Sequence, residues 1–259
     1  MLRTTIPAAM ALTFLAVVKP AQAQTGGGAF GNAGQFIVSA DRLMGLNVWS
    51  TKTEQTSPPL PVAASNKLSG TAFNLLWGGD TGVGSGNAPI YSIPRLGFDY
   101  LVIPGLTVGG SLGYLHRGGS NESTVNNVST TVDTPTGNGL LFVPRVGYIF
   151  DFTPLLSVWA RGGFTYYWMK SDSTNPMGNG TRTRKDSFDG LALSLDPQLV
   201  ITPVPHFGIT VGPMLDLPLA GSEKVETTTT SPAGSTTVTT ENSLKITNWG
   251  LTAGILGYF

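Results

Sequence analysis

The sequence predicts an all-β fold, an eight-stranded antiparallel up-and-down β-barrel that crosses a membrane with its strands. Three observations favour it. Eight segments alternate between apolar residues and small or polar ones, which is typical of strands with one apolar face. Short and long connections alternate strictly between the later segments, and the chain ends on an apolar, strand-like run from Asn248 to Phe259. Tight turns at one end and long loops at the other are typical of transmembrane barrels.

The first 23 residues predict an export signal. Arg3 supplies a positive charge, Ile6 to Val18 is a short apolar core, and Ala21-Gln22-Ala23 is a small-x-small cleavage site. We therefore expect cleavage after Ala23. An apolar core of this length is too short to span a bilayer as a helix, so any membrane insertion of the mature chain is expected to use strands.

The composition narrows the class of protein. The chain has no cysteine, which excludes disulfides in an exported protein. Removing Arg3 and Lys19 with the signal lowers the basic count from 15 to 13 against 15 acidic residues, a net charge of −2. No basic stripe is present, so we expect no nucleic-acid partner. The 34 glycines and 12% charged residues fit short strands with apolar surface that does not meet water.

The mature chain divides into a lead-in and one barrel domain. Residues 24–33 are rich in glycine, and we expect a flexible periplasmic lead-in there. The barrel is expected over residues 34–259. Its eight strands are predicted at 35–51, 91–103, 106–116, 139–150, 155–170, 189–203, 207–220 and 248–259.

An internal repeat indicates that the barrel is assembled from hairpins. Ile93-Pro94-Arg95-Leu96-Gly97-Phe98 recurs fifty residues later as Val143-Pro144-Arg145-Val146-Gly147-Tyr148, and a looser third copy begins at Pro197. Proline cannot donate to a strand ladder. Because these prolines share one place in the hairpin unit, we predict a shared local β-bulge.

Two N-terminal features leave alternatives open. Thr71 to Trp77 is too apolar for an ordinary loop and is interpreted as a rim strand or a loop folded onto the barrel mouth. A ten-stranded barrel is the alternative, since bacterial single-chain barrels have even strand numbers. Simple alternation places Arg42 toward lipid, where a midplane arginine would cost ~2–4 kcal/mol. A bulge near Asp41-Arg42 would turn it inward.

In the seven strand segments that follow 35–51, every arginine and aspartate of the strand core falls on the small-residue face. We expect six of them to form a charge network in the lumen: Arg95, Asp99, Arg145, Arg161, Asp196 and Asp216. An eight-stranded barrel is just wide enough to be filled by its own side chains, and buried charges need partners. The six residues therefore favour a filled lumen. The alternative is a polar constriction that passes small ions or solutes, although matched charges do not make a selectivity ring of one sign.

The alternation, the export signal and the terminal phenylalanine together resemble the small bacterial outer-membrane β-barrel proteins of the OmpA/OmpX-like kind. The resemblance implies residence in the Gram-negative outer membrane, contact with outer-membrane lipid, and recognition of Thr252, Gly254 and Phe259 by barrel-assembly machinery. Aromatic residues are expected at the membrane interfaces, namely Tyr100, Tyr148, Phe150, Tyr166, Trp168, Phe207 and Trp249.

Catalysis is not expected from this sequence. Its two histidines, His116 and His206, are predicted at opposite ends of the barrel. A lipid-modifying enzyme could combine His116 with Ser111 or Glu122, but Ser111 is predicted to face the lumen and Glu122 to lie in a polar loop. Histidine does not recur at ligand spacing and cysteine is absent, so neither a metal site nor a cofactor is expected.

The function favoured by these patterns is structural or surface-interacting. Long polar segments at 117–137, 171–186 and 221–242 are expected as extracellular loops that meet an external partner, which the sequence does not name. Two β-prone, threonine-rich runs within the last segment, 226–230 and 235–240, either extend the strands above the bilayer as hairpins or stay mobile. The alternatives are a small passive channel and, with less support, an outer-membrane lipid enzyme. We expect a monomer.

Overall fold

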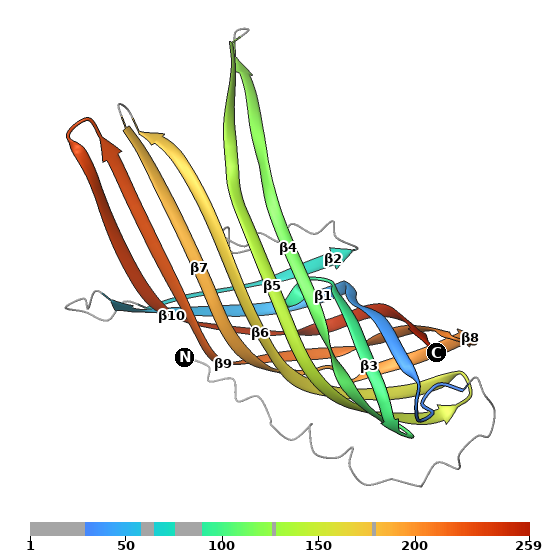
Figure 1. The fold of residues 1–259 in the computed structure, drawn as a ribbon. Helices are drawn as coiled ribbons and strands as arrows, with labels where there is room; N and C mark the ends of the chain where they lie inside the picture. The colour runs from blue at the N-terminus through green and yellow to red at the C-terminus, as the bar shows by residue number, and fades with distance from the viewer. Residues whose placement is uncertain (1–28, 58–64, 76–89, 126–127, 178–179) are drawn as a thin grey trace, which may run out of the picture.

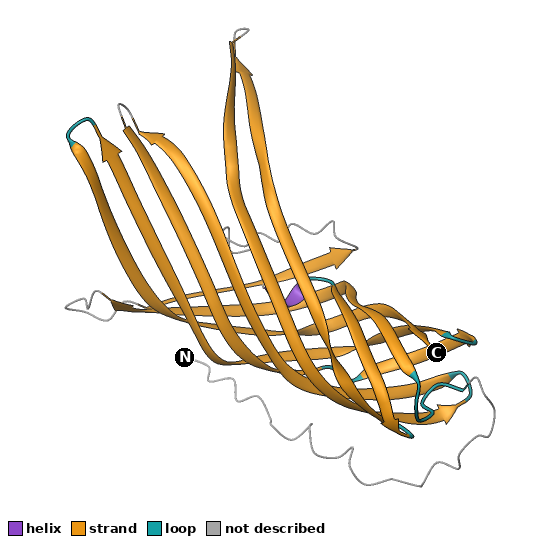
Figure 2. Ribbon diagram, viewed as in Figure 1, coloured by secondary structure: helices purple, strands orange, loops and turns teal. Residues whose placement is uncertain are grey.

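The computed structural model describes residues 29–57, 65–75, 90–125, 128–177 and 180–259, which form a single antiparallel β-sheet closed into a ring (Figures 1 and 2). Its strands are β1 (Phe36–Ser57), β2 (Ser65–Leu75), β3 (Arg95–Ile103), β4 (Leu106–Val125), β5 (Val128–Thr153), β6 (Leu156–Met177), β7 (Gly180–Leu195), β8 (Gln198–Val204), β9 (Phe207–Ser231) and β10 (Gly234–Tyr258). The 3-10 helix η2 (Ile90–Ser92) precedes β3. No helix among the described residues is long and apolar enough to cross a membrane.

The ring has eight strand positions. β7 and β8 count as one position, because both pair with β6 and both pair with β9. The order is β1, β3, β4, β5, β6, β7 with β8, β9 and β10, and β10 pairs with β1 to close the ring. This confirms the predicted eight-stranded, up-and-down antiparallel barrel.

The tenth strand, β2, lies outside the ring path and pairs with β1 alone. It lies along the upper part of β1, from Met44 to Glu54, whereas β3 pairs with β1 only from Phe36 to Asp41. Phe73 pairs with Leu46, and both side chains are exposed on the outer face. The described part of the apolar segment 71–77 is thus a rim strand on the barrel wall; residues 76 and 77 lie outside the described residues.

The predicted polar loops are largely strands. The described residues of 117–137 extend β4 and β5, those of 171–186 extend β6 and β7, and those of 221–242 extend β9 and β10 around one tight turn. These hairpins rise well beyond the barrel body (Figure 1). Their polar sequences show no contrast between two faces, so periodicity did not reveal them, although threonine and valine favour strands.

The predicted shared bulge at the prolines is wrong. Pro94 lies just before β3, Pro197 lies in the break between β7 and β8, and Pro144 lies inside β5. The ladders on both sides of Pro144 and Pro197 keep one register through these positions. Each proline removes only its own N–H donor. A strand start at Pro94 and a strand break at Pro197 accommodate that loss without an extra residue, and at Pro144 the strand continues in register without that donor.

The outer surface of the barrel is apolar. Side chains such as Phe98, Leu112, Phe142, Phe164 and Leu251 are 48–58% exposed, because they alternate with residues that point into the ring. The seven aromatics predicted for the membrane interfaces are all on this surface, with exposures from 37% to 55%. An apolar exterior around a closed sheet is the arrangement that lipid tails require.

A lumen filled in three layers

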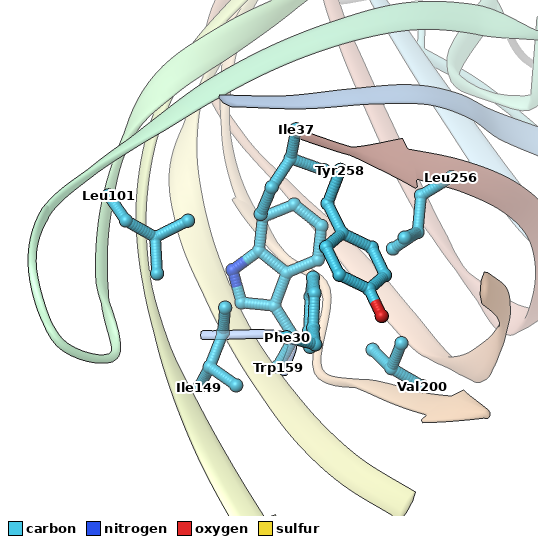
Figure 3. Packing of buried hydrophobic residues seen from close by; sticks show 8 residues of the cluster. All are labelled: Phe30, Ile37, Leu101, Ile149, Trp159, Val200, Leu256 and Tyr258. Carbon is cyan, nitrogen blue, oxygen red and sulfur yellow. The ribbon is translucent and has the colours of Figure 1, made fainter. Parts of the chain in front are cut away.

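The end of the barrel that carries the short turns and Phe259 is closed by a lower apolar layer (Figure 3). This layer consists of Phe30, Ile37, Leu101, Ile149, Trp159, Val200, Leu256 and Tyr258, all buried. Phe30 meets the rings of Trp159 and Tyr258 edge-on, with centroids 6.2 and 5.1 Å away. Aromatic pairs favour this geometry, and eight strands supply enough side chains to fill the bore.

Phe30 belongs to the predicted lead-in, whose described end at residues 29–33 is not a free linker. Its backbone is fastened to the first turn, because the Gly105 amide donates to the Gly31 carbonyl at 2.9 Å. The Gln35 side chain accepts from the amides of Gly31 and Asn32 at 3.0 Å each. The segment before β1 therefore helps to close the lower end of the barrel.

A charged layer lies above this apolar layer. It contains four arginines and four aspartates: Asp41, Arg42, Arg95, Asp99, Arg145, Arg161, Asp196 and Asp216. The six charges predicted for the lumen are all among them. Seven of the eight are at most 7% exposed, and the Asp196 side chain is 13% exposed. The layer as a whole carries no net charge.

Five of these residues form one continuous chain of ion pairs. Arg145 contacts Asp99 through Nη2 at 2.6 Å and Nε at 3.0 Å, and Asp41 through Nη1 at 2.5 Å. Asp41 also accepts from Arg161 at 2.9 Å, and Arg161 reaches Asp196 at 2.6 Å. Asp41 thus links two arginines that arise from different strands. Forked guanidinium–carboxylate contacts of this kind fix geometry as well as charge.

A second group surrounds Asp216. Arg42 donates to both of its carboxylate oxygens, at 2.9 and 3.1 Å. Ser194 and Asn248 donate to the same carboxylate at 2.6 and 3.0 Å. Ser194 and Asn248 fall on the inner face by alternation, so the sequence could have placed them beside a lumen carboxylate.

Arg95 is held differently from the other arginines. Its Nη2 donates to the Tyr91 carbonyl at 3.1 Å, and Arg42 Nη1 donates to the same oxygen at 2.6 Å. Among the described residues no carboxylate forms an ion pair with Arg95. The two guanidinium groups therefore fasten the backbone of the segment that precedes β3 inside the barrel.

Asp41 and Arg42 are the lumen charges beyond the predicted six, and Arg42 faces inward through the bulge that the sequence left as an alternative. Arg42 has a left-handed φ of 57°, and two extra residues separate Ala40 from Met44 in the register against β10. This bulge turns Arg42 from the lipid side into the lumen. A side chain at Gly254 would meet the Ala40 carbonyl, so the glycine lets β10 approach the bulge closely.

Trp159 connects the charged layer to the lower apolar layer. The Arg161 and Arg145 guanidinium carbons lie 4.6 and 5.5 Å from its ring centroid. Its Nε1 donates to Thr107 Oγ1 at 3.0 Å. A desolvated cation over an indole face is stabilised by ~2 kcal/mol. Trp159 therefore packs within the lower apolar layer and also stabilises the arginines of the charged layer.

Glycines on the inner face leave the space that the large lumen side chains occupy. A Cβ at Gly97 would meet Arg145 Nη2 and Ser39 Oγ, and one at Gly147 would lie 2.6 Å from the Trp159 nitrogen. Contacts this short require a neighbour to move. The small-residue face of the sequence pattern is therefore the complement of the large side chains that fill the bore.

An upper apolar layer lies on the other side of the charges. It consists of Ile90, Tyr91, Ile93, Leu141, Tyr167, Met169 and Ala192. Three of these come from η2 and the residue after it, which enter the lumen from above. The Tyr91 and Tyr167 rings meet edge-on at 5.4 Å, and Tyr91 is fully buried. The sequence pattern did not predict that this segment would plug the barrel.

The candidate catalytic groups are not brought together. His116 Nδ1 lies 2.7 Å from Asn138 Oδ1 on the exposed side of the barrel, whereas Ser111 is buried on the inner face. His206 Nδ1 lies 2.8 Å from the Tyr258 carbonyl in the turn after β8. At the chain end, Thr252 Oγ1 donates to the Met44 carbonyl at 3.1 Å, and the Phe259 ring stacks on His206.

No family model and no curated protein sequence matches this chain. Among solved structures it is similar to Ail, the attachment invasion locus protein of Yersinia pestis, with 15% identity, a TM-score of 0.34, and coverage of 86% of this chain and 99% of Ail. The complex of Ail with the heparin analogue sucrose octasulfate gives 15% identity, a TM-score of 0.33 and the same coverage. The outer membrane protease OmpT from Escherichia coli is similar at 10% identity and a TM-score of 0.39, covering 87% of this chain and 97% of OmpT.

Proposed function

We propose that this protein is an integral outer-membrane β-barrel that does not transport solutes and acts through the hairpins above its rim, in a structural or surface-interacting role. The observation that carries the proposal is the filled lumen. Two apolar layers enclose a charged layer in which every aspartate is ion-paired to an arginine. Each layer is built from side chains of several strands, so it is part of the folded barrel and not an added lid.

Location in a bilayer is supported by the export signal and by the exposed apolar exterior. Soluble proteins rarely expose contiguous apolar surface of this extent. The aromatic residues around it suit membrane interfaces. In this arrangement the short turns face the periplasm and the hairpins face the outside.

The lumen contacts support a barrel without conductance. An ion that entered the charged layer would have to displace a carboxylate from its arginine and leave a buried charge unpaired, which typically costs ~3–5 kcal/mol. It would also have to pass Trp159 and Tyr91, both fully buried. Conducting pores need sites that an ion can enter and leave easily.

The proposal includes no catalytic step. His116 and His206 lie at opposite ends of the barrel, each within hydrogen-bond distance of a neighbouring oxygen. Ser111 and His116 lie on opposite faces of β4. A hydroxyl nucleophile needs its base within hydrogen-bond reach, and this pair does not offer it.

Planar-bilayer recording tests the proposal. The refolded wild-type protein should insert and remain electrically silent, in a bilayer where an added water-filled porin gives clear current steps. Arg145→Ala should remain nearly silent as well, because the two apolar layers stay in place. Steady single-channel openings from the wild-type protein would contradict the filled lumen and establish the small-channel alternative.

A further inference from the structure

The upper part of β10, from Gly234 to Thr240, has one free edge. On one side this segment pairs with β9, from Ser231 down to Val225. On the other side the ladder between β10 and β1 ends at the pair of Glu241 with Ser57. No described residue pairs with that side of β10 above Glu241. At ~3.3 Å per residue, seven residues leave an edge roughly 23 Å long.

This edge lacks the features with which natural proteins usually protect free strands. Charges, prolines and bulges discourage pairing with other chains. Three other free edges above the barrel each carry one: Lys67 on β2, Pro135 on β5 and Pro176 on β6. The β10 edge reads Gly-Ser-Thr-Thr-Val-Thr-Thr and keeps one register against β9. It is uncharged, β-prone and fully open, with Val238 57% exposed.

The β10 segment that carries this edge is the outer strand of a regular four-stranded sheet formed by β6, β7, β9 and β10 above the barrel. One row across it consists of Thr174, Thr183, Thr228 and Thr237, each paired with the next. The hydroxyl oxygens of Thr174 and Thr183 are 3.3 Å apart, and those of Thr228 and Thr237 are 3.0 Å apart. The row stops at Thr237 only because the sheet stops there.

We propose that this edge pairs with the same edge of a second copy of the protein, antiparallel and centred on Thr237. In that register Thr237 lies opposite Thr237, Ser235 opposite Thr239, and Thr236 opposite Val238. Threonine and serine pairs are favourable cross-strand neighbours, and β9 with β10 already uses them within one chain. No charge lies on either strand between residues 234 and 240, so the self-pairing meets no like-charge repulsion.

The symmetry of this pairing fixes how the two copies face each other. An antiparallel pair of identical strands has a two-fold axis across the strands, so the two barrels lie at opposite ends of the joined sheet. Given the proposed function, this places the copies in two facing membranes and not side by side in one. One seven-residue pair is weak, but many copies on two apposed surfaces strengthen each other through their high effective concentration.

Clustering of protein-bearing vesicles tests the inference. Wild-type proteoliposomes carrying either of two fluorophores should cluster, and protein-free vesicles should not. The double variant Thr237→Lys, Thr239→Lys should reduce clustering to the protein-free level, because lysines on the edge oppose each other across the two-fold axis. The matched control is Thr181→Lys, Thr183→Lys, which adds the same charge to the same face on the inner strand β7 and should cluster like the wild type.

A cross-link tests the register. Because the chain has no cysteine, Thr237→Cys should form a dimer between vesicles under mild oxidation, and Thr183→Cys, in the same threonine row, should not. Barrel insertion is scored separately by the faster gel migration of unheated samples. Failure of the wild type to insert would contradict the proposed function. Insertion without clustering, or equal dimer yields from the two cysteine variants, would overturn only the edge pairing.

Discussion

The Arg161 guanidinium lies over the Trp159 indole, with its carbon 4.6 Å from the ring centroid. Arg161 is ion-paired to Asp41 and Asp196, while Trp159 also contacts the Phe30 ring edge-on. The contact therefore joins a chain of buried charges to an apolar layer without leaving a polar group exposed to hydrocarbon. Buried ion pairs are stabilising only when their surroundings satisfy them in this way.

Trp159→Ala is expected to lower the free energy of unfolding by ~3–5 kcal/mol, the usual range for a buried large aromatic. It removes the contacts to Phe30 and the support beneath Arg161. Trp159→Phe keeps most of the packing and should lose less. Urea unfolding in lipid vesicles, followed by gel migration, measures both. Equal stability of the alanine variant and the wild type would show that the lower apolar layer is not a structural element.

Arg145→Ala should destabilise the barrel by ~3–5 kcal/mol, because Asp41 and Asp99 lose a partner in a buried setting. Arg184→Ala is the matched control. Arg184 forms an ion pair with Asp186 at 2.8 Å, but its side chain is 49% exposed, so its loss should change stability by ~0–1 kcal/mol. Indistinguishable urea midpoints for the two variants would contradict a stabilising role of the buried lumen ion pairs.

Gly97→Ala should destabilise the barrel by ~1–3 kcal/mol, the usual range for overpacking. The added methyl would occupy space held by Arg145 Nη2 and Ser39 Oγ. Gly118→Ala, where the nearest atom would lie at an ordinary 3.6 Å, should stay within ~0.5 kcal/mol of the wild type. Thermal unfolding of both variants measures the difference. An unchanged unfolding temperature for Gly97→Ala would mean that the Arg145 side chain has room to move.

Phe259→Asp is expected to leave export and signal cleavage intact while the protein accumulates in the periplasm. The reason is that Phe259 closes the lipid-facing row of the last strand and is 70% exposed. Phe152→Asp changes an equally apolar, 67% exposed residue at the same end of the barrel and should still assemble. Cell fractionation measures both; normal outer-membrane levels of Phe259→Asp would rule out a terminal assembly signal.

The sequence by itself determined the eight strand positions and the side on which most residues lie. Side chains alternate strictly along a strand. Arg95, Asp99, Arg145 and Asp216 each alternate with the apolar residues of their strand, and this was enough to place them inside. The same alternation placed the apolar row of the last strand outside. For the long hairpins the sequence offered only an alternative: the threonine-rich runs 226–230 and 235–240 could be strands or mobile loops, and they are strands. A strand that is polar on both faces has no periodic signal, so only its pairing with neighbours reveals it.

The tertiary structure decided everything that depends on contact between distant strands. Arg42 faces inward because a left-handed residue in β1 interrupts the alternation, and Gly254 on β10 gives that bulge its room. Phe30 and Tyr91 fill the two ends of the bore from segments outside the eight ring strands. The positions of these side chains depend on the width of the closed ring and on the space that its glycines leave. Alternation along one strand carries no information about either.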